Sequence, residues 1–251
     1  MAAMAQVGVI ARRNLLHVTS DPQQLIGMTV QPLMFLLLFV YVFGGAIGGS
    51  ARGYLQFVLP GLLIQGIGFW AMQTAVGLNV DFQRGLIDRF RSLPIARSAV
   101  VAGRITADLA RTGWGTLITV GVGVAFGFRL HGGVAGCAAA FLLALAWGFA
   151  LSWVMAFIGV SLRSAESVQT AGFLLIMPLT FASSVFVPVA TMPGWLQAFV
   201  RVNPVTVAAD AARGLMLGGP VAGPVLKAAA WIAGISIVFW ALTLRRYRRR
   251  A

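Results

Sequence analysis

The chain has 251 residues, of which 59% are hydrophobic and 10% charged, and its mean hydropathy is +0.88. This composition excludes a soluble globular domain, because long uncharged runs recur along the whole chain. The net charge of +13 would suit a nucleic-acid-binding protein, but the basic residues lie at the ends of apolar runs and form no continuous basic face. We therefore predict an integral membrane protein with no nucleic-acid partner.

Residues 4–19 are predicted to form an amphipathic helix in the membrane interface. Apolar residues share one face at helical spacing, namely Val7, Ile10, Ala11, Leu15 and Val18. Arg12 and Arg13 lie around the rest of this helix. Pro22 then turns the chain toward the bilayer, because a proline disfavours helical backbone at the residue before it.

Six apolar runs follow, each long enough to cross a bilayer, for which about 20 residues are needed. They cover residues 25–44, 54–78, 105–128, 134–162, 168–189 and 225–244. Charged residues are absent from the middle of every run, and the runs lack the alternation of barrel strands. The fold predicted is an all-α membrane protein with six transmembrane helices.

The lysines and arginines divide unevenly between the two sides of this arrangement. Fourteen fall on the side that holds both termini and five on the other. Because cytoplasmic loops carry the excess of basic residues, both termini are predicted to be cytoplasmic.

A long charged segment, residues 81–97, joins the second and third spans on the cytoplasmic side. Leu86, Ile87, Phe90 and Leu93 form an apolar stripe at helical spacing, and Pro94 ends the helix. The stripe could rest on the membrane or dock into the groove of a partner protein. Soon afterwards Arg104, Asp108 and Arg111 stand four and three residues apart, a spacing that predicts an internal ion pair.

The outer stretch 189–224 is longer than an ordinary loop and contains two amphipathic pieces, which predict two short helices. Pro193 and Pro204 are expected to mark where the two helices start. Trp195 suits a membrane interface, and two interfacial helices with a tryptophan anchor and no gating role remain an alternative.

Three groups of residues together resemble the ABC type-2 exporter permeases, in particular the daunorubicin-resistance branch. The first group is Gly85-x-x-Asp88-Arg89-Phe90-x-x-x-Pro94 with Gly103-Arg104, the second is Tyr54-Leu-Gln-Phe57-Val-Leu-Pro60-Gly61, and the third runs from Phe181 to Pro188, through Met192-Pro193-Gly194-Trp195 and Asn203-Pro204, to Asp210 and Arg213-Gly214. These groups lie in the right order on a six-span frame, so the resemblance covers essentially the whole chain.

The resemblance implies a single ABC type-2 transmembrane domain over residues 1–251, in the bacterial plasma membrane. Its partners would be a separate ABC nucleotide-binding subunit, which binds ATP and Mg, and a second permease copy or paralogue. It also implies a motor-coupling role for Gly85, Leu86, Asp88, Arg89, Phe90, Leu93 and Pro94. The outer helices would act as a lid over the exit, with Met192, Pro193, Trp195, Asn203 and Pro204 as lid residues.

Other features of the sequence agree with this division of labour. The chain contains no G-x-x-x-x-G-K-[ST] phosphate-binding loop, so ATP hydrolysis is expected on another polypeptide. The two histidines, His17 and His131, have no partner at ligand spacing, so no metal site or bound cofactor is expected. The uncharged spans favour an amphipathic drug-like or lipid-like cargo.

Two other classes of function stay open at this point. An ion-coupled secondary transporter usually carries a carboxylate or histidine at membrane depth, whereas all six acidic residues here fall at span ends or in loops. A lipid-scaffolding membrane protein without transport is an alternative that the sequence does not separate from a permease.

Overall fold

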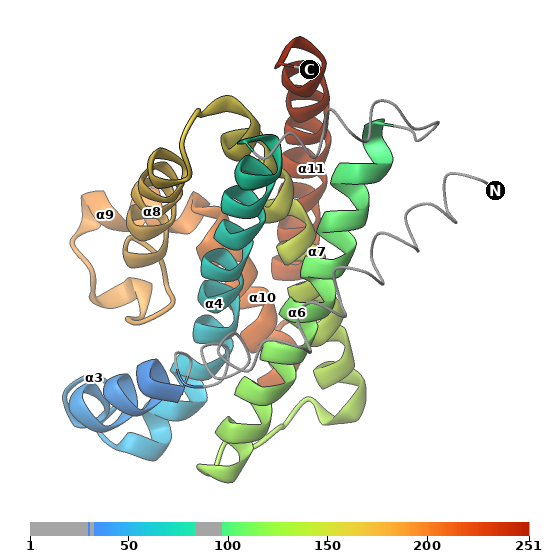
Figure 1. The fold of residues 1–251 in the computed structure, drawn as a ribbon. Helices are drawn as coiled ribbons and strands as arrows, with labels where there is room; N and C mark the ends of the chain where they lie inside the picture. Colours follow the sequence, from blue (N-terminus) through green and yellow to red (C-terminus); the bar gives the residue numbers. More distant parts are fainter. Residues whose placement is uncertain (1–29, 31–32, 84–96, 251) are drawn as a thin grey trace.

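The computed structural model describes residues 30, 33–83 and 97–250, which fold into a helical bundle (Figure 1). A helix over Leu33–Gly48 includes the π-turn η1 (Phe39–Phe43) and α3 (Gly44–Gly48). The elements that follow are α4 (Ala51–Gln83), α6 (Arg97–Ala125), α7 (Gly133–Ser161), α8 (Ala165–Phe181), η2 (Val189–Thr191), α9 (Gly194–Val202), α10 (Pro204–Leu217) and α11 (Ala222–Arg250). The regular structure of the described residues is helical, as predicted.

Some predictions fall on parts of the chain outside the described residues. They are the interfacial helix 4–19 with Arg12 and Arg13, the start of the first span, and most of the coupling segment, including Gly85, Leu86, Asp88, Arg89, Phe90, Leu93 and Pro94.

Three helices in the described part of the chain are long and apolar enough to cross a membrane. These are α4, α7 and the part of α11 over Ala222–Tyr247. They correspond to the second, fourth and sixth predicted spans. α8 has 17 residues, fewer than the roughly 20 that a perpendicular crossing needs. The number of six spans therefore stays a prediction.

The fifth predicted span, 168–189, is wrong at its C-terminal end, because α8 stops at Phe181. Ser183 and Ser184 follow directly, and serine hydroxyls compete with helical bonding by binding nearby backbone groups. Here the Ser183 hydroxyl donates to the Thr180 carbonyl and accepts from the Val185 N–H at 3.2 Å. The apolar run continues to Val189, but its last part is not helix.

The Leu33–Gly48 helix and α4 form a tight hairpin. Its connection contains Gly49, which has a φ of +66° that favours glycine. A side chain at Gly48 would lie 2.6 Å from the Tyr54 Cβ, and one at Gly44 would lie 2.9 Å from the Ala51 Cα. Glycines at these two positions allow the two helices to approach closely.

The bundle has two distinct ends. At the basic end, the Gln83 amide donates to the Arg163 carbonyl at 3.0 Å, and the rings of Phe82 and Tyr247 have centroids 5.3 Å apart. This end therefore gathers the last turn of α4, the start of α8 and the arginine-rich end of α11, where the C-terminus lies in Figure 1.

The opposite end, called the turn end, holds the start of α4 and the turn between α6 and α7. The Gln56 amide donates to the Gly127 carbonyl at 3.1 Å, and the Gln56 side-chain oxygen accepts from the Arg129 N–H at 3.2 Å. The N–H groups of His131 and Gly132 both donate to the Met216 carbonyl, which brings the end of α10 to the same place.

Candidate functional site

The segment 182–188, between α8 and η2, is a non-helical stretch in the interior of the bundle, and we call it the buried connector. Ser183, Ser184, Val185 and Phe186 are all 5% exposed or less. Non-helical backbone inside a membrane protein requires partners for its N–H and C=O groups, because each unsatisfied group costs several kcal/mol. The partners of the connector therefore define this site.

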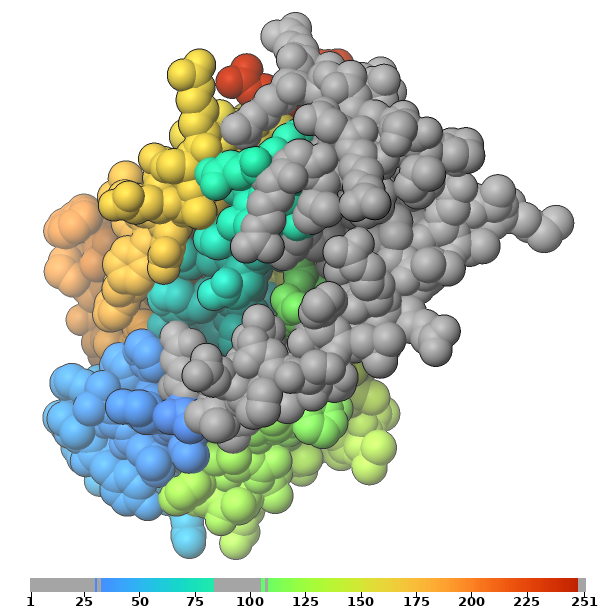
Figure 2. All heavy atoms as spheres, in the orientation of Figure 1, coloured from blue at the N-terminus to red at the C-terminus, as the bar shows by residue number. Residues whose placement is uncertain are grey.

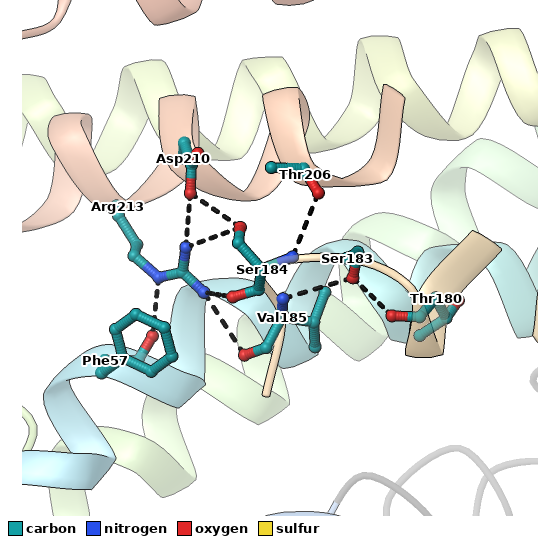
Figure 3. A network of polar contacts seen from close by, with 8 residues as sticks. All are labelled: Phe57, Thr180, Ser183, Ser184, Val185, Thr206, Asp210 and Arg213. Carbon is teal, nitrogen blue, oxygen red and sulfur yellow. Dashed lines mark hydrogen bonds and ion pairs between the residues drawn. The ribbon is translucent and has the colours of Figure 1, made fainter. Parts of the chain in front are cut away.

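Arg213 of α10 donates three hydrogen bonds to the connector, more than any other side chain in the described part of the chain (Figure 3). Its Nη2 donates to the carbonyls of Ser184 and Val185, and its Nε donates to the Phe57 carbonyl of α4 at 2.9 Å. The guanidinium also lies over the Phe57 ring, 4.0 Å from the centroid, in a cation–π contact. A single side chain thus joins α10, α4 and the connector.

Two further residues of α10 face the same segment. Asp210 Oδ1 accepts from Arg213 Nη1 at 2.6 Å and from the Ser184 hydroxyl at 2.8 Å. Thr206 Oγ1 accepts from the Ser184 N–H at 3.0 Å. Thr206, Asp210 and Arg213 are four and three residues apart, a spacing that places them on one helix face.

Asn203 joins the start of α10 to the end of α8. Its side-chain oxygen accepts from the Val205 N–H at 2.9 Å, which is an N-cap. Its amide donates to the carbonyls of Leu179 at 2.8 Å and Ala182 at 2.6 Å. One buried side chain therefore begins one helix and satisfies the end of another.

α4 holds the connector from the other side. The Tyr54 hydroxyl donates to the Phe186 carbonyl at 2.8 Å. A side chain at Gly61 would lie 2.8 Å from the Val185 carbonyl oxygen, so the close approach of α4 to the connector requires glycine there. Connector, α4, α8 and α10 are consequently locked into one arrangement.

The polar groups of this site bind one another and join neighbouring helices. They are carbonyls, hydroxyls, one carboxylate and one guanidinium. Among the described residues, no group of histidine, cysteine and carboxylate side chains is placed to hold a metal ion. The site holds α10, α4 and α8 together through the connector.

The predicted lid residues lie on or beside the two short helices. Pro193 is the N-cap of α9 and Pro204 is the first residue of α10, so both predicted helix starts are confirmed. The Met192 carbonyl accepts from the Gln197 amide at 2.8 Å, and Trp195 is 77% exposed. Among the five predicted lid residues, Asn203 is the one that forms a hydrogen bond with the connector, at the Ala182 carbonyl.

The sequence did not single out Arg213, Asp210 and Ser184 as a site beyond their place in the resemblance. A signal was present, because Asp210 and Arg213 are three residues apart and are the only charges in the 14-residue α10. Charged pairs in apolar helices usually face the protein interior. Within α6, the predicted Asp108–Arg111 ion pair is confirmed at 3.0 Å.

Comparison with known proteins agrees with this architecture. The family model for the ABC-2 type transporter matches residues 5–217, which include the connector and its partners on α4 and α10. The chain belongs to the ABC-2 type transporter family. It is 41% identical over 229 residues to the daunorubicin resistance ABC transporter permease protein DrrB1 of Streptomyces coeruleorubidus, covering 91% of this chain and 81% of that protein.

The chain is also similar to two further permeases. The probable doxorubicin resistance ABC transporter permease protein DrrC of Mycobacterium tuberculosis is 31% identical over 98% of this chain and 89% of its own length. The inner membrane transport permease YadH of Escherichia coli is 24% identical over 70% of each chain. ABC-2 permeases are transmembrane subunits whose ATPase is a separate subunit, so the prediction of a permease without its own ATPase is confirmed.

Proposed function

We propose that this ABC-2 permease exports an amphipathic drug-like or lipid-like molecule across the bacterial plasma membrane. The observation that carries the proposal is the 41% identity, over most of both chains, to a daunorubicin resistance permease. The apolar character of α4, α7 and α11 supports a cargo that itself partitions into apolar surroundings. A nucleotide-binding subunit with ATP and Mg supplies the energy, and a second permease copy or paralogue completes the pathway.

The proposed topology has six spans and places the basic end in the cytoplasm. Arg163 and the arginine-rich end of α11 support this orientation, because both lie at the basic end. The two flanks of segment 84–96 lie at the same end. These flanks are the last turn of α4 and the start of α6. Cytoplasmic sides of membrane proteins carry the excess of arginine and lysine.

Cysteine labelling tests this orientation. In a Cys137→Ala background, we expect Ser50→Cys and Gly219→Cys to react with an impermeant thiol reagent added outside cells, because both positions lie near the turn end. Ser164→Cys, at the basic end, is expected to react only after the membrane is permeabilised. Labelling of Ser164→Cys in intact cells would reverse the proposed orientation.

The segment 81–97 is proposed to be the coupling helix that docks into the ATPase. In support, α4 ends at Gln83 and α6 begins at Arg97, so both flanks of the segment lie at the basic end. The apolar stripe and charges between Gly85 and Pro94 then stand where a soluble motor would meet the permease.

Variants of this segment test the motor-driven function itself. Phe90→Ala and Asp88→Arg are expected to insert normally but to weaken ATPase association and reduce daunorubicin efflux to background, because a docking groove loses its anchor or meets the wrong charge. Phe173→Ala is the matched control, since Phe173 is 47% exposed on α8. Normal ATPase association and efflux in both coupling variants would contradict this role.

The short helices α9 and α10 are proposed to form a lid on the outer side. α9 keeps Val200 buried and leaves Trp195 exposed, so its tryptophan is free to sit in the membrane interface. α10 is fixed to α4 and α8 through Arg213 and Asn203. A lid built this way would move together with the buried connector.

A further inference from the structure

A small apolar pocket lies between the Leu33–Gly48 helix and α4, at the turn end of the bundle. Its volume is ≈ 130 Å³, and its walls include Leu36, Val40, Tyr41, Leu55 and Phe126. Apolar cavities of about 150 Å³ hold a single benzene ring. The pocket therefore suits one apolar ring or part of an acyl chain, and is too small for a whole multi-ring drug.

The helix that forms one wall departs from α-helical geometry at the pocket. Val40 and Tyr41 belong to the π-turn η1, and π-turns are rare and often occur at functional sites. Tyr41 lines the pocket and is 66% exposed, so the wall that it forms is accessible. Figure 2 shows this helix, in blue, at the surface of the molecule.

Arg52 is the one charged residue among those that line the pocket. In the part of the chain that the structure describes, its side chain has no ion pair or hydrogen bond. Among the acidic residues that the structure describes, Asp81 and Glu166 lie at the opposite, basic end, and Asp108 and Asp210 are paired with arginines. The pocket thus combines an apolar interior with an uncompensated cation.

Hydrogen bonds between α4 and the α6–α7 turn fix the backbone near Arg52. Gln56, one helical turn after Arg52, binds the backbone of Gly127 and Arg129 in the α6–α7 turn. Arg52 Nε lies 3.7 Å from where a side chain at Gly127 would begin, and Gly127 has a φ of +97°. Phe126 of the same turn lines the pocket, so the apolar wall and the guanidinium are held relative to each other.

We propose that this pocket binds one acyl chain of an anionic phospholipid, whose phosphate pairs with Arg52. A guanidinium binds phosphate oxygens in a two-pronged geometry, and the apolar walls fit a hydrocarbon chain. The start of a membrane-spanning helix is also the depth at which lipid headgroups lie. A cationic amphiphile is disfavoured by the same charge. The lipid assignment depends on the pocket walls and on Arg52, and it does not rest on the proposed export function.

Lipid retention by the purified permease tests the phosphate contact. Mass spectrometry should detect bound phosphatidylglycerol in the wild type, and Arg52→Gln should lower its affinity about fivefold, the effect of about 1 kcal/mol for one basic residue at a lipid surface. Arg129→Gln, a matched exposed arginine outside the pocket lining, should bind as the wild type does. Equal retention by Arg52→Gln and the wild type would overturn the proposal.

The apolar part of the site is tested by filling it. Leu37→Trp places a larger side chain at the pocket lining and should reduce phosphatidylglycerol binding, whereas Leu38→Trp, at a neighbouring position that is 52% exposed and outside the lining, should not. A diacylglycerol with the same chains should bind more weakly than phosphatidylglycerol. Inorganic phosphate at millimolar concentration is then added as a competitor of bound phosphatidylglycerol. If it displaces phosphatidylglycerol as well as added lipid does, the site binds free anions and the lipid assignment is overturned.

Discussion

Replacing Arg213 with methionine is expected to lower the free energy of unfolding of the permease in detergent by about 3 kcal/mol. The substitution keeps an apolar side chain of similar length but removes the guanidinium donors to the carbonyls of Phe57, Ser184 and Val185. The carbonyls of Ser184 and Val185 belong to buried residues, and an unpaired acceptor there costs about 1–3 kcal/mol. The expected loss is at the lower end of the range for broken buried pairs because the Asp210 side chain is 45% exposed.

Two further variants give this prediction its controls. Arg201→Met removes an arginine from α9 that donates to Gln197 in an exposed hydrogen bond, so a change within about 0.5 kcal/mol is expected. Arg213→Lys should fall between wild type and Arg213→Met, because an ammonium group keeps the charge but cannot reproduce the fork of the guanidinium. If Arg213→Met and Arg201→Met have the same free energy of unfolding in a denaturant titration, the contacts of Arg213 do not stabilise the fold.

The second large effect is expected at Asn203, where alanine should lower the free energy of unfolding by about 2–4 kcal/mol. The loss has two parts. The N-cap to Val205 disappears, and the carbonyls of Leu179 and Ala182 lose their amide donor. Asn203→Ser keeps an oxygen for the cap but not the amide, so the difference between the serine and alanine variants measures the cap alone.

Ser164→Ala is the matched control, because Ser164 caps α8 by accepting from the Ser167 N–H at 3.1 Å and is not part of the connector. It should cost about 1 kcal/mol, the usual value of a lost cap. We expect export of the proposed amphipathic cargo to fall further in Asn203→Ala than in Ser164→Ala, since only the former loosens the proposed lid. Equal unfolding free energies for the two alanine variants would mean that Asn203 is only a cap.

Local patterns in the sequence predicted several features well. The fourth predicted span, 134–162, differs by one residue at each end from α7, because an uninterrupted apolar run leaves a membrane-spanning segment few alternatives to a helix. Pro193 and Pro204 mark helix starts because a missing N–H is tolerated in the first turn. The ion pair of Asp108 and Arg111 likewise depends on spacing within one helix.

The site could not be predicted in the same way. Arg213 and the Phe57 carbonyl are 156 residues apart in sequence, and the carbonyl itself carries no residue-specific signal. A composition-based view treats 182–188 as the end of an apolar span, since Val185 and Phe186 are hydrophobic. The helix nevertheless stops at Phe181, because serines, Thr206 and Arg213 satisfy the backbone in another way.

The sequence by itself therefore determined an apolar, helical ABC-2 permease with its basic residues gathered at one end, because composition, helical period and charge bias act over neighbouring residues. Only the tertiary structure decided that α8, the fifth predicted span, ends at Phe181. It also decided that the buried connector forms hydrogen bonds with α4 and α10, and that Arg52 lies at an apolar pocket. Each of these depends on partners distant in sequence, whose backbone groups and side chains meet only once the helices have packed.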